Sequence, residues 1–275
     1  MRFHHSALSP ALFTTVILGV LHAQAQQPDW RAGGKTERVL EQSAEQGRFT
    51  FIVFYKANDA ATQAMAGAVE QGIAAKAGEA TLAFVRISDP AEKQLVDKFA
   101  VSRAPMPLCL AVAPNGAVTG MFRKSPSAED VAKAFVTPTM TRCMKAMQDG
   151  KIVLVCVQGK RQTPTPPAVT DLQADPQFKD RIATVSLPTQ DPAEAEFLAQ
   201  LQIDANNASG IGTVMLAPPG VLVGKFPPNA TMSEMAAALH EAGKCCDDEN
   251  CKHHKPAAGA AKHKATQNPT NTRRN

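Results

Sequence analysis

Histidine is absent from the long middle part of this 275-residue chain. Three of the seven histidines lie at or before residue 22, and the others are His240, His253, His254 and His263. Residues 26–239 therefore contain no imidazole that can act as a general base. Unless the C-terminal residues fold back onto this part, the absence excludes hydrolases of the Ser-His-Asp and Cys-His kinds.

Long apolar runs are also absent. The run at residues 11–21 (ALFTTVILGVL) follows Arg2 and precedes the small-x-small sequence AQA at 23–25. A membrane span needs about 20 apolar residues, so this shorter run indicates a secretory signal at residues 1–25 that is removed before Gln26. The alternative is an uncleaved membrane anchor. We expect a mature chain without a membrane span, exported to a periplasm or secreted.

The chain has little excess of charge, with a net charge of +4. Much of the positive charge lies in the last 24 residues, where it favours solvation over nucleic-acid binding. Because the expected export also disfavours such binding, we expect no nucleic-acid partner. No glycine-rich phosphate loop and no HExxH motif occurs.

A ten-residue pattern, A-P-x-G-x-x-x-G-x-F, occurs twice, at residues 113–122 and 217–226. In each copy an apolar stretch leads into a Pro/Gly turn and a second stretch leads out. This arrangement predicts a β-hairpin.

The surroundings of the two hairpins repeat as well. DPAE occurs at 89–92 and at 191–194, and Gly47 corresponds to Gly150. In DPAE, Asp suits a helix cap, Pro suits the first helical position, and Glu at the third position is expected to reach back to the cap. The matched positions are 102 to 104 residues apart, so the chain contains two copies of one unit.

The order of elements in each copy predicts an α/β fold. Helices and strands alternate and are followed by the hairpin and a last helix, which implies a mixed central sheet flanked by helices. We place the domains at residues 26–137 and 138–243, with a disordered tail at 244–275. In the second copy, a proline-rich loop at 163–168 and a short polar helix near 171–178 replace the long helix.

The first copy resembles the thioredoxin-like superfamily over about 100 residues. FIVFYKANDAATQAM is similar to the strand that runs into the redox helix, and RAPMPLCLAVAPNGAVTG is similar to the segment with the cis-proline, strand and turn. The resemblance implies a cis peptide bond at Pro107, with Pro105 as the alternative. The second copy resembles the family more weakly.

The chain departs from the family at the redox site. Where redox-active thioredoxins have Cys-x-x-Cys, this sequence has Asp59, Ala60, Ala61 and Thr62. In the second copy the loop at 159–162 lacks cysteine, and Ile211-Gly212-Thr213 stands in the cis-proline region. The resemblance implies two redox-inactive domains that bind a protein or peptide near Asp59 and Pro107.

The cysteines of the body fit structural roles. Cys109 and Cys156 lie within apolar stretches and are expected to be buried thiols. Met140, Cys143, Met144 and Met147 share one helical face, which suits either Cu(I) or core packing. The repeat aligns Cys143 with Leu40, and this favours the core.

The tail carries the one unusual group of potential ligands. Five residues suit Zn or Cu and lie within KCCDDENCKHHK: Cys245, Cys246, Cys251, His253 and His254. Their spacing matches no zinc-finger pattern. A disulfide between Cys246 and Cys251 is an alternative, and so is a solvated segment without a role.

These observations favour an exported, redox-inactive tandem protein that acts as a binding or scaffold module and needs no cofactor. The alternative is a thiol–disulfide oxidoreductase or a metal-binding protein that works through the tail. Asn207 and Asn229 fit the glycosylation pattern, which matters only in an organism that glycosylates exported chains.

Overall fold

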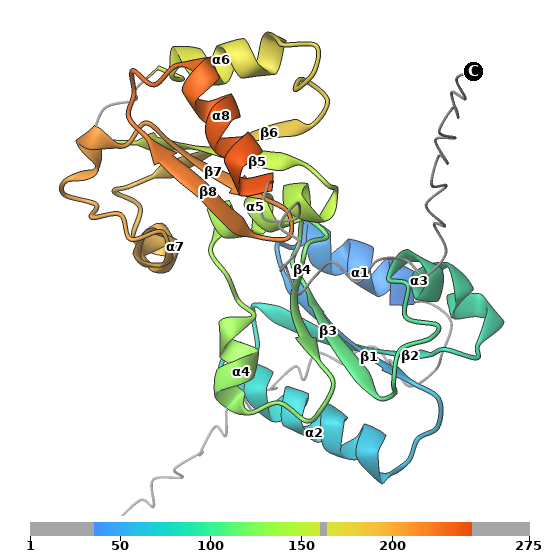
Figure 1. Cartoon of the computed structure of the whole chain (residues 1–275). Coiled ribbons are helices and arrows are strands. Elements are labelled where there is room, and N and C mark those ends of the chain that lie inside the picture. The colour runs from blue at the N-terminus through green and yellow to red at the C-terminus, as the bar shows by residue number, and fades with distance from the viewer. Residues whose placement is uncertain (1–35, 160–163, 244–275) are drawn as a thin grey trace, which may run out of the picture.

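The computed structural model describes residues 36–159 and 164–243 (Figure 1). The expected signal segment at 1–25 and the Cys/His tail at 244–275 lie outside these residues. No helix within the described ranges is long and apolar enough to cross a membrane.

Two four-stranded sheets form the centres of two successive units. The first has the order β2-β1-β3-β4 and the second the order β6-β5-β7-β8. In each sheet the first two strands in the chain are parallel, and the hairpin strands add antiparallel pairs at one side. The strands are β1 (Phe49–Tyr55), β2 (Ala80–Arg86), β3 (Leu108–Val112), β4 (Val118–Phe122), β5 (Ile152–Gln158), β6 (Ile182–Pro188), β7 (Thr213–Ala217) and β8 (Val221–Phe226).

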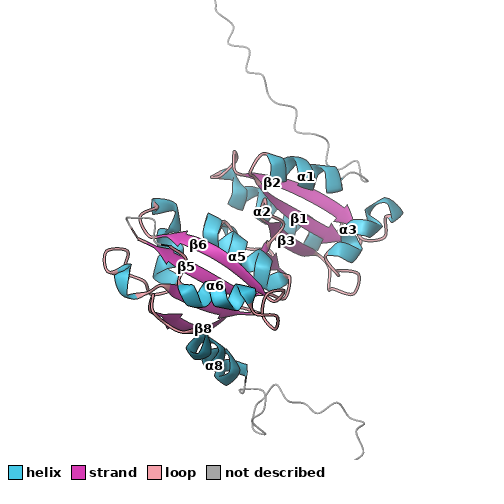
Figure 2. Ribbon diagram, turned by 90° about the horizontal axis from the view of Figure 1, so that it is seen from above, coloured by secondary structure: helices cyan, strands magenta, loops and turns pink. Residues whose placement is uncertain are grey.

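Helices cover both faces of each sheet (Figures 1 and 2). In the first unit α1 and α3 pack on one face, and α2 and α4 on the other. In the second unit α5 and α7 pack on one face, and α6 and α8 on the other. The helices are α1 (Thr36–Glu45), α2 (Ala60–Ala74), α3 (Lys93–Lys98), α4 (Ala128–Lys133), α5 (Pro138–Gln148), α6 (Pro167–Ala174), α7 (Ala195–Gln200) and α8 (Met232–Gly243).

This topology is the thioredoxin-like fold, present twice in tandem. Both repeated decapeptides lie on equivalent hairpins, β3–β4 and β7–β8, as the sequence predicts. The limits 26–137 and 138–243 remain predictions, because the outer ends of both ranges border residues that the structure does not describe.

The DPAE segments form caps as expected, but their glutamates act differently. Asp89 accepts a hydrogen bond from the Ala91 amide at 2.9 Å, and Asp191 does the same for Ala193. Glu92, expected to reach back to this cap, is instead buried beneath α1. Oε1 of Glu92 accepts two hydrogen bonds from Thr36, one from the hydroxyl at 2.9 Å and one from the backbone amide at 3.4 Å.

The second domain repeats this arrangement. Oε1 of Glu194 accepts from the Thr139 hydroxyl at 2.6 Å and from its amide at 2.8 Å. We call each arrangement a Thr–Glu clamp. The first amides of a helix have no partner within the helix, so α1 and α5 offer donors that a buried carboxylate needs.

One difference from the sequence interpretation concerns α6. The expected polar helix near 171–178 is observed as Pro167–Ala174, and Ala168, Val169 and Leu172 form its buried face. Pro167 occupies the first helical position, where its missing N–H costs nothing. The prolines that suggested a loop therefore include the start of the helix.

The sulfur-rich face of α5 is a core face. Cys143 is buried, and Met140 and Met147 pack against the same core cluster, so the core interpretation is confirmed. The burial of Cys109 and Cys156 within β3 and β5 is also confirmed.

Contacts between α5 and β4 join the two domains. The side-chain amide of Gln148 donates to the Val118 carbonyl at 2.7 Å, while its oxygen accepts from the Val118 amide at 2.9 Å. Asn115, in the turn before β4, donates to the Thr141 carbonyl at 2.8 Å. At Val118, the edge strand β4 of the first sheet is therefore covered by α5, the first helix of the second domain.

We expect the Thr–Glu clamp to contribute to stability. Thr139→Val removes the hydroxyl donor to the buried carboxylate of Glu194, whose Oε2 has no hydrogen-bond partner among the described residues, so it should lower the free energy of unfolding by about 1–3 kcal/mol. Thr170→Val, at an exposed position of α6, should change it by less than about 0.5 kcal/mol. Urea unfolding followed by circular dichroism compares them. Equal stability of the two variants would contradict this assignment.

Candidate functional site

In the first domain, β1 ends at Tyr55, and Asp59 caps the start of α2. Oδ1 of Asp59 accepts a hydrogen bond from the Thr62 amide at 2.9 Å, and the Thr62 hydroxyl donates to the Ala57 carbonyl at 2.9 Å. The hydrogen bond from the Thr62 amide, with a smaller contribution from the Thr62 side chain, lowers the pKa of Asp59 below its ordinary value. The carboxylate therefore caps the helix, where its negative charge interacts favourably with the positive end of the helix dipole.

The other residues singled out from the sequence lie as follows. Ala60 and Ala61 form the first turn of α2 after Asp59, without any nucleophilic side chain. The Met106–Pro107 peptide bond is cis, whereas Pro105 follows a trans bond. The five candidate metal ligands Cys245, Cys246, Cys251, His253 and His254 lie outside the described residues.

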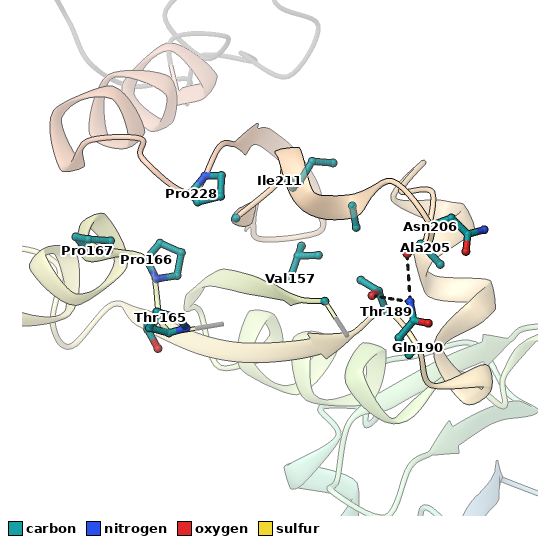
Figure 3. Close-up of a pocket in the computed structure, with 14 residues that line it drawn as sticks. Val157, Thr165, Pro166, Pro167, Thr189, Gln190, Ala205, Asn206, Ile211 and Pro228 are labelled. Atoms are coloured by element: carbon teal, nitrogen blue, oxygen red, sulfur yellow. Dashed lines mark hydrogen bonds between the residues drawn. The ribbon is translucent and has the colours of Figure 1, made fainter. Parts of the chain in front are cut away.

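The equivalent end of the second domain contains a hollow of about 540 Å³ beside the end of β5 and the start of β7 (Figure 3). Among the lining residues that the structure describes, none carries a charge and four are prolines. The lining residues are Val157, Gly159, Pro164, Thr165, Pro166, Pro167, Thr189, Gln190, Ala205, Asn206, Ala208, Ile211, Gly212 and Pro228. We call this hollow the proline hollow.

Gly212 occupies the position where the resemblance expects a cis-proline. Its amide donates to the Phe226 carbonyl at 2.8 Å, and its carbonyl accepts from the Val157 amide at 3.0 Å. A Cβ atom at this position would lie 2.6 Å from Cα of Pro228. The residue must be glycine for the chain around Pro228 to approach so closely and form one wall of the hollow.

Polar groups at the other side of the hollow are partly engaged. The side-chain amide of Gln190 donates to the Ala205 carbonyl at 3.3 Å, and its nitrogen lies 3.4 Å from the Thr189 hydroxyl (Figure 3). These bonds orient Gln190 along the rim. The hollow thus combines an apolar interior with uncharged polar groups at its margin, which is typical of binding sites.

The three cysteines within the described ranges are free and buried. Burial raises the pKa of each thiol: that of Cys156 to about 11, that of Cys143 to about 12, and that of Cys109 further still. Near neutral pH these sulfurs stay protonated, and only the thiolate is a nucleophile. Within the same ranges, no group of three or more His, Cys, Asp or Glu residues is placed to hold a metal ion.

The sequence predicts a binding surface near Asp59 and Pro107 and does not reveal the proline hollow. By themselves, the prolines at 164, 166 and 167 predict only a loop. Their meeting with Pro228 and Ile211 depends on the way the second sheet brings distant segments together.

The chain is similar to several solved structures, whereas no protein-family model and no curated protein matches it. A thioredoxin from Thermus thermophilus matches at 19% identity and a TM-score of 0.30, over 44% of this chain and 96% of that one. Zinc-bound human ERp44 matches at 10% identity and a TM-score of 0.33, over 76% of this chain and 59% of that one.

The NTD_N/C domain of the alkylhydroperoxide reductase AhpF from Enterococcus faecalis also matches. Its identity is 16% and its TM-score is 0.25, over 74% of this chain and 98% of that one. At these identities the likeness concerns the fold alone.

We expect the body thiols to be unreactive in the folded protein. In a variant with Cys245, Cys246 and Cys251 changed to Ser, iodoacetamide near neutral pH should label none of the remaining three, because their raised pKa values keep them protonated and burial shields them. After denaturation all three should react, as mass spectrometry can count. A body cysteine that reacts equally fast before and after denaturation would contradict the assigned burial.

Proposed function

We propose that this chain is an exported, redox-inactive tandem protein that acts as a binding or scaffold module. Its second domain binds an extended, uncharged, apolar segment of a protein or peptide. The observation that carries the proposal is the proline hollow, which has about 540 Å³ of space and no charged side chain among its described lining residues.

The chemistry of the hollow favours an apolar chain segment. Moving the apolar groups of a ligand out of water lowers the free energy. Val157, Ile211 and the prolines form an apolar surface on which these groups can pack. A charged group would lose hydration without meeting an opposite charge among the described lining residues, so charged segments should bind poorly. Prolines also have a fixed φ angle, which reduces the ordering cost of binding.

The absence of thiol chemistry is supported by the start of α2. A cysteine there would be acidified by the helix terminus, but Asp59 holds this place as an ionised cap. The three described cysteines are buried thiols with raised pKa values. Export is supported by the sequence of residues 1–25, which resembles a secretory signal.

A peptide titration tests the proposal. The uncharged peptide acetyl-Gly-Leu-Pro-Leu-Gly-amide should shift the NMR signals of the residues that line the proline hollow and should do so saturably. The same peptide with Asp in place of either Leu should bind more weakly by roughly tenfold or more, since its charge finds no partner among the described lining residues.

Two variants of the second domain provide the matched comparison. Ile211→Glu places a charge in the hollow and should weaken peptide binding by roughly tenfold or more. Leu222→Glu makes the same kind of change on β8, where the side chain is 48% exposed and lies outside the hollow, so binding should be unchanged. Equal binding by the two variants, with both folded by circular dichroism, would refute this site.

A further inference from the structure

A second hollow, of about 530 Å³, lies in the first domain between α2 and the edge strand β2. Unlike the proline hollow, it is lined by charged groups of both signs. Its lining residues are Tyr55, Asn58, Thr62, Gln63, Ala66, Gly67, Glu70, Phe84 and Arg86. We call it the α2–β2 hollow.

Small residues on α2 keep this space open. Ala66 and Gly67 face the hollow from the middle of the helix. A Cβ atom added at Gly67 would meet no other atom within 4 Å, so space rather than packing surrounds this residue. By contrast, a Cβ atom at Gly72 of the same helix would lie 2.6 Å from Val131. Gly72 is therefore explained by close helix packing, whereas Gly67 is not.

Two aromatic rings supply apolar surface in the hollow. Phe84, on β2, is 9% exposed, and Tyr55 is half-buried at the end of β1. The two residues lie on neighbouring parallel strands and belong to the same core cluster. A ligand that rests on them can bury apolar surface without disturbing the core.

Opposite charges stand on the two sides of the hollow. Arg86 comes from the end of β2, and its guanidinium carbon lies 5.9 Å from the centre of the Tyr55 ring. Glu70 comes from α2. Neither takes part in any of the four ion pairs found among the described residues. Each charge is thus available to a ligand.

We propose that the α2–β2 hollow binds a small zwitterion with an apolar body, of which a free α-amino acid with a large apolar side chain is the simplest example. Arg86 binds its carboxylate, since the planar guanidinium matches a carboxylate with two parallel hydrogen bonds. Glu70 binds its ammonium group, and the side chain lies against Tyr55 and Phe84. The volume falls within the range of about 300–1,000 Å³ of small-molecule sites.

This site is separate from the proposed function. It lies in the other domain, shares no residue with the proline hollow, and has a different ligand chemistry. Either site can fail its test while the other passes.

Calorimetric titration of the full chain with three related probes tests the inference. L-Phenylalanine carries both charges, N-acetyl-L-phenylalanine lacks the ammonium group, and L-phenylalaninamide lacks the carboxylate. L-Phenylalanine should bind saturably, and each of the other two should bind about tenfold more weakly or worse, since each loses the charge-assisted contact to one of the two charged side chains. No saturable heat with L-phenylalanine up to its solubility overturns the proposal.

Variants assign each charge to its partner. In Glu70→Gln, L-phenylalanine should bind no better than its N-acetyl form, and in Arg86→Gln it should bind no better than the amide. Arg38→Gln and Glu41→Gln, at exposed positions of α1, are the matched charge controls and should leave binding unchanged. If the charge controls weaken binding as much as the two site variants do, the effect is one of net charge and the assigned site is wrong.

A third variant fills the space. Gly67→Leu places a side chain in the hollow and should abolish binding, while the better helix propensity of Leu keeps α2 intact. Ala64→Leu enlarges an exposed residue of the same helix that does not line the hollow, and it should bind like the unmodified protein. Undiminished binding by Gly67→Leu would place the ligand elsewhere.

Discussion

Each domain depends on a buried carboxylate that holds the start of its first helix. In the second domain, Glu194 accepts from both the amide and the hydroxyl of Thr139, and Arg142 donates to the same hydroxyl at 2.9 Å. Burying a carboxylate without such donors would be strongly unfavourable. The clamp therefore fixes α5 relative to the DPAE segment before α7, and Glu92 with Thr36 does the same in the first domain.

The clamps lie on one face of each sheet, and the two domains differ on the opposite face. On that opposite face, the first domain has the 15-residue α2 and the second has the eight-residue α6. Where α6 is shorter, the prolines at 164, 166 and 167 approach Pro228 and Ile211 around the proline hollow. On α2, Gly67 leaves a space of different chemistry between Glu70 and Arg86. One architecture thus carries two unlike hollows, one without charge and one with both signs.

The sequence predicts those features that depend on neighbouring residues. The Pro/Gly turns of the two hairpins and the capping roles of Asp89 and Asp191 follow from local chemistry. The role of Glu92 does not, because its partner Thr36 lies 56 residues earlier in the chain. The proline hollow was missed for a similar reason, since it requires Pro228 to meet a glycine at position 212. Caps and turns are local, whereas cavities and buried polar pairs arise from packing.

The central claim is that the protein binds without thiol chemistry, and an insulin-reduction assay on the mature protein tests it most directly. With dithiothreitol as reductant, the account predicts that insulin precipitates no faster than without the protein. Faster precipitation that disappears when Cys245, Cys246 and Cys251 are changed to Ser would contradict the account and assign a thiol–disulfide exchange activity to the tail.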